Sequence, residues 1–188
     1  MGEAHQRKKE PEQVRNALLE CAARMTAEQG LAHVSLEAVA RAAGVTKGGL
    51  LHHFPNKNAL IEAMFEKMVT ELDQLIDEYM DRDEMAFGRF TRAYVEAAFS
   101  DVSPDPADPW EALCMSSIIE PELQKRWSDW MVSRLKRHEA TDNDPMLEIV
   151  RMAVDGALFA FLTKAHNSEF IFDAPGLRAR LLALTRQP

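Results

Sequence analysis

The chain has 188 residues, of which 46% are apolar and 28% charged, and its formal net charge is −8. This composition is typical of a globular protein of one or two domains. The longest apolar run is far shorter than the ~18 residues of a membrane span, and the polar amino-terminus lacks the apolar stretch of a signal peptide. Cys21 and Cys114 fit no zinc or disulfide pattern. We therefore expect a cytoplasmic protein without membrane contact, metal or cofactor.

Charge is distributed unevenly along the chain. Residues 1–57 contain eight Lys or Arg and six Asp or Glu, whereas residues 58–188 contain fourteen and twenty-four. An acidic surface repels DNA, and binding to phosphates needs clustered basic groups. Only the first third of the chain can therefore approach a nucleic acid favourably.

The first third of the chain predicts three short helices followed by a long one. Apolar residues recur at helical spacing up to Gly30, which ends the first helix. Residues 36–43 and 47–53 form two further helices, with Ser35 and Thr46 as their N-caps. Gly44, between them, can adopt the positive φ that ends a helix. Asn56 then caps a long helix over residues 57–80.

The remaining two thirds of the chain also predict helices. We expect them at residues 84–100, 110–120, 121–138, 145–165 and 175–185, joined by a proline-rich loop at 102–109 and a linker at 140–144. No strand pair or repeat stands out. The fold class is therefore all-α, with an N-terminal three-helix helix-turn-helix head and a C-terminal helical domain.

The helix-turn-helix segment resembles the TetR/AcrR family of transcriptional regulators. The family signature is matched by Gly44-Val45-Thr46, Gly48-Gly49-Leu50, His53-Phe54 and Asn56-Lys57. The resemblance covers about residues 12–65. It implies a DNA-binding domain at residues 1–57 and an effector-binding and dimerisation domain at 58–188. The chain departs from the family at Leu51, where a tyrosine usually touches a phosphate, and at Asn58, where an acidic residue is common.

The residues predicted to bind DNA lie at the ends of the motif's helices. Lys47 can donate to guanine or to a phosphate, and glycines beside it let the backbone approach the groove closely. Lys57 begins the next helix, where an ammonium and free N–H groups suit a phosphate. Ser35 serves as a cap, a phosphate contact or both, and we favour His52 over His53 for a phosphate. The full set is Ser35, Thr46, Lys47, Gly48, Gly49, His52, His53 and Lys57.

The C-terminal part contains no catalytic constellation, and we do not expect an enzyme. It is rich in Met and aromatic residues, which build either a core or an adaptable ligand pocket, and the family resemblance implies an effector cavity there. Asp155 lies in an otherwise apolar helix, so that it either pairs with Arg151 or across a dimer, or faces the ligand, where Glu96 and Glu111 can join it. The expected effector residues are Glu96, Trp110, Met115, Trp127, Trp130, Met131, Asp155 and Phe159.

The helix from Met146 to Ala165 is apolar on almost every side, so we expect it to be buried on more than one side. With the final helix it predicts a four-helix interface across a two-fold axis, and hence a homodimer. The expected interface residues are Val150, Val154, Ala157, Leu158, Phe161, Leu181 and Leu184.

These observations indicate a ligand-responsive regulator that binds a palindromic double-stranded DNA operator. The family resemblance favours a repressor, released by a small-molecule effector that is large, apolar and cationic, as in the control of efflux or detoxification. One alternative is a sensor of fatty-acyl or other anionic amphiphiles, for which Lys125, Arg126 and Arg134 supply basic groups. The other is a helical adaptor that no longer binds DNA.

Overall fold

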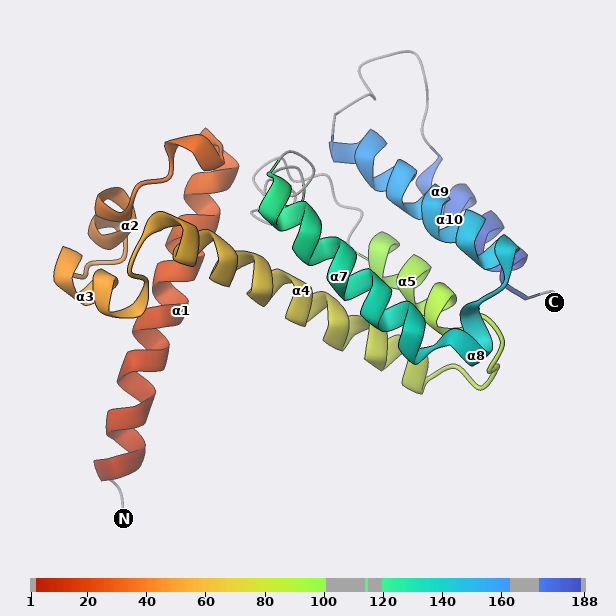
Figure 1. Cartoon of the computed structure of the whole chain (residues 1–188), viewed down its shortest axis with the longest axis horizontal. Coiled ribbons are helices and arrows are strands. Elements are labelled where there is room, and N and C mark those ends of the chain that lie inside the picture. The colour runs from red at the N-terminus through yellow and green to blue at the C-terminus, as the bar shows by residue number, and fades with distance from the viewer. Residues whose placement is uncertain (1–2, 101–113, 115–119, 163–172, 187–188) are drawn as a thin grey trace. The chain divides into compact units, whose positions relative to one another are not determined.

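The computed structural model describes residues 3–100, 114, 120–162 and 173–186, without the side chains of residues 3–10, 161 and 162. The described residues form helices and no strand, which confirms the all-α fold class (Figure 1). The chain divides into two compact units, residues 1–68 with 105–123 and residues 69–104 with 124–188. The long helix α4 (Lys57–Asp81) contributes to both units.

The first unit is built on the head of the chain. Its helices before α4 are α1 (Glu3–Gln29), η1 (Leu31–His33), α2 (Leu36–Ala42) and α3 (Lys47–His53). α1 contacts η1 and α2, and α2 contacts α3. Leu18, Val39, Leu50 and Leu60, from α1, α2, α3 and α4, are completely buried. Because helices of seven residues are unstable alone, α2 and α3 depend on this shared core.

The second unit is arranged around α5 (Arg89–Phe99). The other helices are α7 (Pro121–Arg137), which begins in the first unit, α8 (Glu139–Asp142), α9 (Pro145–Leu162) and α10 (Ala174–Leu184). α5 contacts α8, α9 and α10, and α9 also contacts α10. The core contains Ile76, Phe90, Tyr94, Val95, Val150, Val154 and Leu181. The expected helix at 110–120 and the loop at 102–109 lie outside the described residues, apart from residues 114 and 120.

The helix expected from Glu84 begins instead at Arg89, so this prediction was wrong at its start. Gly88, at the N-cap, has a φ of +68°, which α-helical residues do not adopt. Arg92 holds the preceding segment: its guanidinium donates to Asp83 Oδ2 and to the Met85 carbonyl, each at 2.6 Å. The backbone carbonyls of this segment thus accept hydrogen bonds from an arginine side chain instead of from the amides of a helix.

The linker expected at residues 140–144 is also wrong in part, because α8 covers residues 139–142. Asp142, only 1% exposed, accepts hydrogen bonds from the Thr91 amide at 2.8 Å and the Thr91 hydroxyl at 2.7 Å. The Phe90 amide also donates to it, at 3.3 Å. Asp142 therefore caps α5 from a distant part of the chain.

A second buried charge fastens α7 to the C-terminal part of α4. Arg134 is 1% exposed, and its Nη2 donates to Asp77 Oδ1 at 2.6 Å. Asp73 accepts from Trp130 Nε1 at 2.8 Å and lies 3.4 Å from Arg134 Nε. Asp73 and Asp77 are four residues apart on α4, and Trp130 and Arg134 are four residues apart on α7. The members of each pair therefore lie on one side of their helix, and these two sides face each other.

His138 is a half-buried imidazole in the second unit. Its ring stacks on Phe90 with 5.3 Å between centroids, and its Nε2 is buried with no hydrogen-bond partner among the described residues. Burial lowers the pKa of His138, and the nearby Arg134 lowers it further, although Asp142 and Asp77 act in the opposite direction. The folded chain therefore binds fewer protons at this ring than the unfolded chain does.

We predict that stability falls as the pH drops below about 6.5, the ordinary pKa of an unfolded histidine, because protonation then favours the unfolded chain. His138→Phe keeps the stacked ring and should make the free energy of unfolding less dependent on pH between about 7 and 5. Urea titrations across this range measure it. His33→Gln, at an exposed position, is the control, and an unchanged pH dependence in His138→Phe would contradict the assignment.

Candidate DNA-binding surface and effector site

The ends of α2 and α3 are formed as the sequence predicts. The Ser35 hydroxyl accepts from the Ala38 amide at 3.2 Å, and the Thr46 hydroxyl from the Gly49 amide at 3.1 Å. Gly44, between the two helices, has a φ of +68°. These local contacts satisfy amides at each helix start and set the turn of a helix-turn-helix.

One side of α3 is open to solvent. Lys47, Gly48, Leu51 and His52 are exposed on it, while Leu50 points into the core. A side chain added at Gly48 would meet nothing within 4 Å, so this backbone is accessible to a large partner. Such a side is what a helix needs in order to enter a major groove.

The two glycines of α3 have different surroundings. A Cβ at Gly49 would lie 3.3 Å from the Thr46 hydroxyl, which is tighter than ordinary van der Waals contact, whereas Gly48 has free space. The sequence pattern alone did not distinguish them. The contact with the Thr46 hydroxyl explains Gly49, whereas Gly48 has open space around it.

Lys47 forms an ion pair across the two helices of the motif. Its Nζ lies 2.5 Å from Glu37 Oε1 on α2, and both side chains are mostly exposed. The hydrogen bond from Lys47 lowers the pKa of Glu37. Because an exposed pair of this kind contributes little stability, Lys47 can exchange Glu37 for a phosphate or a base.

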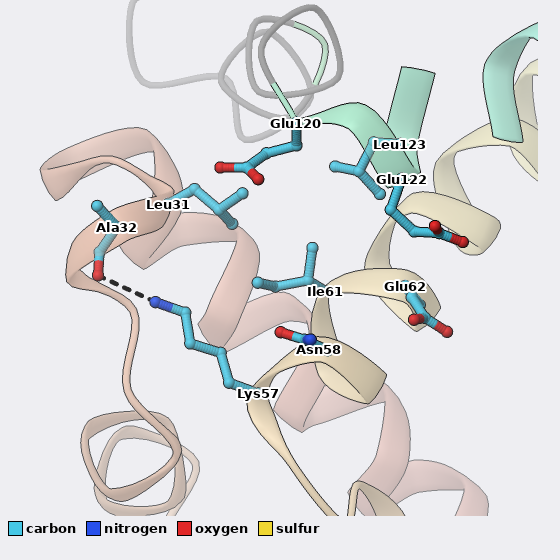
Figure 2. A pocket seen from close by; sticks show the side chains of 9 residues that line it. All are labelled: Leu31, Ala32, Lys57, Asn58, Ile61, Glu62, Glu120, Glu122 and Leu123. Carbon is cyan, nitrogen blue, oxygen red and sulfur yellow. Dashed lines mark hydrogen bonds between the residues drawn. The ribbon is translucent and has the colours of Figure 1, made fainter. Parts of the chain in front are cut away.

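Lys57 also has a partner within the head. Its Nζ donates to the Ala32 carbonyl at 3.0 Å and thereby ties the start of α4 to η1 (Figure 2). The surrounding pocket, of about 240 Å³, is lined by three glutamates, Glu62, Glu120 and Glu122. Because this ammonium is bound to a carbonyl within the head, the predicted phosphate contact of Lys57 requires it to leave Ala32.

The two histidines at the end of α3 differ in exposure. His52 is exposed, whereas His53 is half-buried, with its ring 5.6 Å from that of His52 and 6.3 Å from that of Phe54. His53 packs beside the buried Phe54, and His52 is free to meet a partner. The preference for His52 as the phosphate contact therefore stays a prediction with a suitable geometry.

Among the expected effector residues, Asp155 has a neutral partner. The Tyr94 hydroxyl donates to Asp155 Oδ1 at 2.5 Å. Burial raises the pKa of Asp155, although Tyr94 and the nearby Arg151 lower it. Arg151 does not form the expected ion pair with Asp155 among the described contacts, because its Nη1 donates to Thr91 and to the Asp142 carbonyl. Sequence analysis missed Tyr94, since its partner lies 61 residues away.

The other expected effector residues are dispersed. Glu96 is bound by the guanidinium of Arg178 on α10. The ring centroids of Trp127 and Trp130 are 4.8 Å apart. Both rings and Met131 pack against the core of the second unit. Phe159 is 51% exposed. Trp110 and Met115 lie outside the described residues, so they cannot be placed.

The expected dimer residues need correction. Val150, Val154, Ala157 and Leu181 are at most 5% exposed and belong to the protomer's own core. Their side chains are therefore covered before any partner binds. Leu158 also packs against this core, while Leu184 is 44% exposed. Phe161 lies in α9, but its side chain is outside the described part of the chain.

Within the described ranges, no three His, Cys, Asp or Glu side chains gather as they would around a metal ion. No helix in the described part of the chain has both the length and the apolar character needed to cross a bilayer.

Two family models match the chain. Bacterial regulatory proteins of the tetR family match residues 18–64, and the Tetracyclin repressor-like C-terminal domain matches residues 88–186, which is more than half of the chain. The chain therefore belongs to the TetR family of transcriptional regulators. This confirms the family resemblance found in the sequence.

Individual relatives match mainly through part of their length. The HTH-type transcriptional regulator AcrR of Shigella flexneri is 34% identical over 76 residues, 40% of this chain and 35% of AcrR. The HTH-type transcriptional repressor KstR2 of Rhodococcus jostii is 36% identical over 83 residues, 44% of this chain and 38% of KstR2. The chain thus spans well under two thirds of these curated relatives.

Solved structures match over nearly the whole chain. The multidrug binding protein EbrR complexed with malachite green has a TM-score of 0.70 at 18% identity, covering 92% of this chain and 98% of that chain. At this level of identity the likeness shows a shared fold.

The Lys47–Glu37 pair generates a test of the DNA-binding surface. We predict that Glu37→Gln strengthens binding to every duplex, because it removes a negative charge and releases Lys47. Lys47→Ala should weaken binding and reduce the slope of log affinity against log salt by about one for each protomer. Anisotropy titrations at several salt concentrations measure both effects. Glu28→Gln, an exposed carboxylate on α1, is the control, and equal affinity of the wild type and Glu37→Gln would contradict the prediction.

Proposed function

We propose that this protein is a homodimeric repressor that binds a palindromic operator and is released from it by a small-molecule effector. The observation that carries the proposal is the exposed side of α3, held by its caps on the head of a TetR-family chain. In this proposal residues 1–57 form the DNA-binding domain and residues 58–188 the effector and dimerisation domain. α4 begins at that boundary and connects the two functions.

The exposed side of α9 supports dimerisation. Ile149, Met152 and Phe159 are 58%, 65% and 51% exposed, an unusual amount for apolar side chains at helical spacing. Gly156 lies in the same row, and a Cβ there would meet nothing within 4 Å, so a partner helix can approach closely. Leu184 of α10 is exposed as well. This row replaces the buried residues that the sequence pattern suggested.

Asp155 supports a cationic effector. Its carboxylate is half-buried, and its hydrogen-bond donor, Tyr94, is neutral. By contrast, Glu96 is paired with Arg178, and Asp77 with Arg134. Arg151 lies nearby but is not hydrogen-bonded to Asp155, so the charge of Asp155 is less compensated than that of Glu96, and an apolar cation would relieve the cost of its burial. EbrR, which shares the fold, is described as a multidrug binding protein with bound malachite green.

The basic groups considered for an anionic effector have other roles. Arg134 is 1% exposed and bound to Asp77, so it is not accessible at a cavity mouth. Lys125 pairs with Asp129 at 2.6 Å. Because Arg134 is inaccessible and Asp155 offers a half-buried carboxylate, we favour a cationic effector over a fatty-acyl one.

DNA binding is tested by selecting duplexes from a random-sequence library with the purified protein. We expect a two-fold symmetric sequence whose affinity falls steeply with salt. Recovery of no preferred duplex would favour the alternative of a helical adaptor without DNA binding.

The α9 row makes a prediction about assembly. Met152→Arg should convert the wild-type dimer into a folded monomer, because the side chain is exposed in the protomer but a partner would bury its charge. Light scattering at micromolar concentration measures the mass, and circular dichroism confirms folding. Met85→Arg, also at an exposed methionine, is the control. A dimeric Met152→Arg protein would contradict this choice of interface.

The Asp155 carboxylate makes a prediction about effector binding. Asp155→Asn should weaken binding of malachite green by about 1.5–3 kcal/mol, the usual contribution of a hydrogen-bonded charge. The stability at pH 7 should stay the same or rise, since the variant avoids ionising a half-buried group and keeps an acceptor for Tyr94. Tryptophan quenching and urea unfolding measure the two effects. Glu148→Gln, an exposed neighbour on α9, is the control, and equal affinity of wild type and Asp155→Asn would return Asp155 to a structural role.

A further inference from the structure

Leu51 is a large apolar side chain on the exposed side of α3. It is 39% exposed, although Leu50 beside it is completely buried. Lys47 and Gly48 precede it by four and three residues, so all three lie on one side of the helix. Packing in the head therefore covers Leu51 only in part, and its remaining surface lies on the side that would face DNA.

A major groove offers few favourable surroundings for such a side chain. Base edges present hydrogen-bond donors and acceptors, and the backbone presents charged phosphates. Covering any of these with leucine would remove water without replacing its hydrogen bonds. The exception is the C5-methyl group of thymine, the apolar group on the base edges of the major groove.

The surroundings of Leu51 allow this contact. Gly48, one turn earlier, has no side chain that could hold the helix away from the bases, and a Cβ there would meet nothing within 4 Å. Lys47, on the same side, supplies the positive charge that draws the helix towards the duplex. An apolar side chain one turn from an accessible backbone and a cation can reach a base edge.

We propose that Leu51 determines part of the operator sequence by packing against a thymine C5-methyl group in each half-site. The inference rests on the proposed function, since it requires α3 to enter the major groove. It assigns Leu51 to direct reading of a base, in place of the phosphate contact that a tyrosine would make.

The test compares thymine with deoxyuridine, which pairs identically but lacks the methyl group. The probe is the duplex selected by the wild-type protein from a random library, with thymines replaced one symmetric pair at a time. At one pair the wild type should lose about fourfold in affinity for each methyl group removed. Leu51→Ala should lose a similar factor on the thymine duplex and be indifferent to the replacement. Val132→Ala, at an exposed position on α7, should retain the wild-type response.

Each outcome bears on a distinct claim. A wild-type affinity that is unchanged by deoxyuridine at every position overturns the role of Leu51 while leaving the regulator intact. A Leu51→Ala protein that still loses affinity at the same pair also overturns it, because the methyl group is then read by another residue. Failure to select any duplex overturns the proposed function, and the inference with it.

Discussion

Asp142 carries the contact on which the arrangement of the C-terminal unit depends. Its carboxylate receives the first amides of α5 and the hydroxyl of Thr91, and Thr91 in turn accepts from Arg151 of α9. One buried charge thus joins α5, α8 and α9. An unsatisfied helix start at the centre of a core would cost several kcal/mol. Since α5 contacts three other helices, fixing its start fixes the framework around which the others pack.

The head uses the same physical rule with local partners. Ser35 and Thr46 satisfy the starts of α2 and α3 from the position just before each helix, and Asn56 does so for α4. The short helices α2 and α3 pack one side against the core of the head and leave the other side exposed. That exposure is less favourable for an apolar side chain such as Leu51 than for Lys47, and the DNA contact proposed above would cover it.

Three acidic side chains of the C-terminal part are paired with arginines. Asp73 and Asp77 face Arg134, and Glu96 faces Arg178. Such pairs recover much of the free energy lost when charges leave water. Asp155, whose donor is a neutral hydroxyl, recovers less. In the proposed function this carboxylate meets a ligand that brings its own positive charge, at the hydrogen bond that joins α5 to α9.

The sequence by itself determined the helical class, the motif's caps and the positive φ of Gly44, because these depend on residues within four positions of one another. It could not determine which side of α9 faces the core, because that helix is apolar on nearly every side and periodicity then has no preferred direction. Nor could it find Asp142 as a cap or Tyr94 as the partner of Asp155, since each pair lies more than 50 residues apart. Those contacts exist only after the helices pack, and the tertiary structure alone decides them.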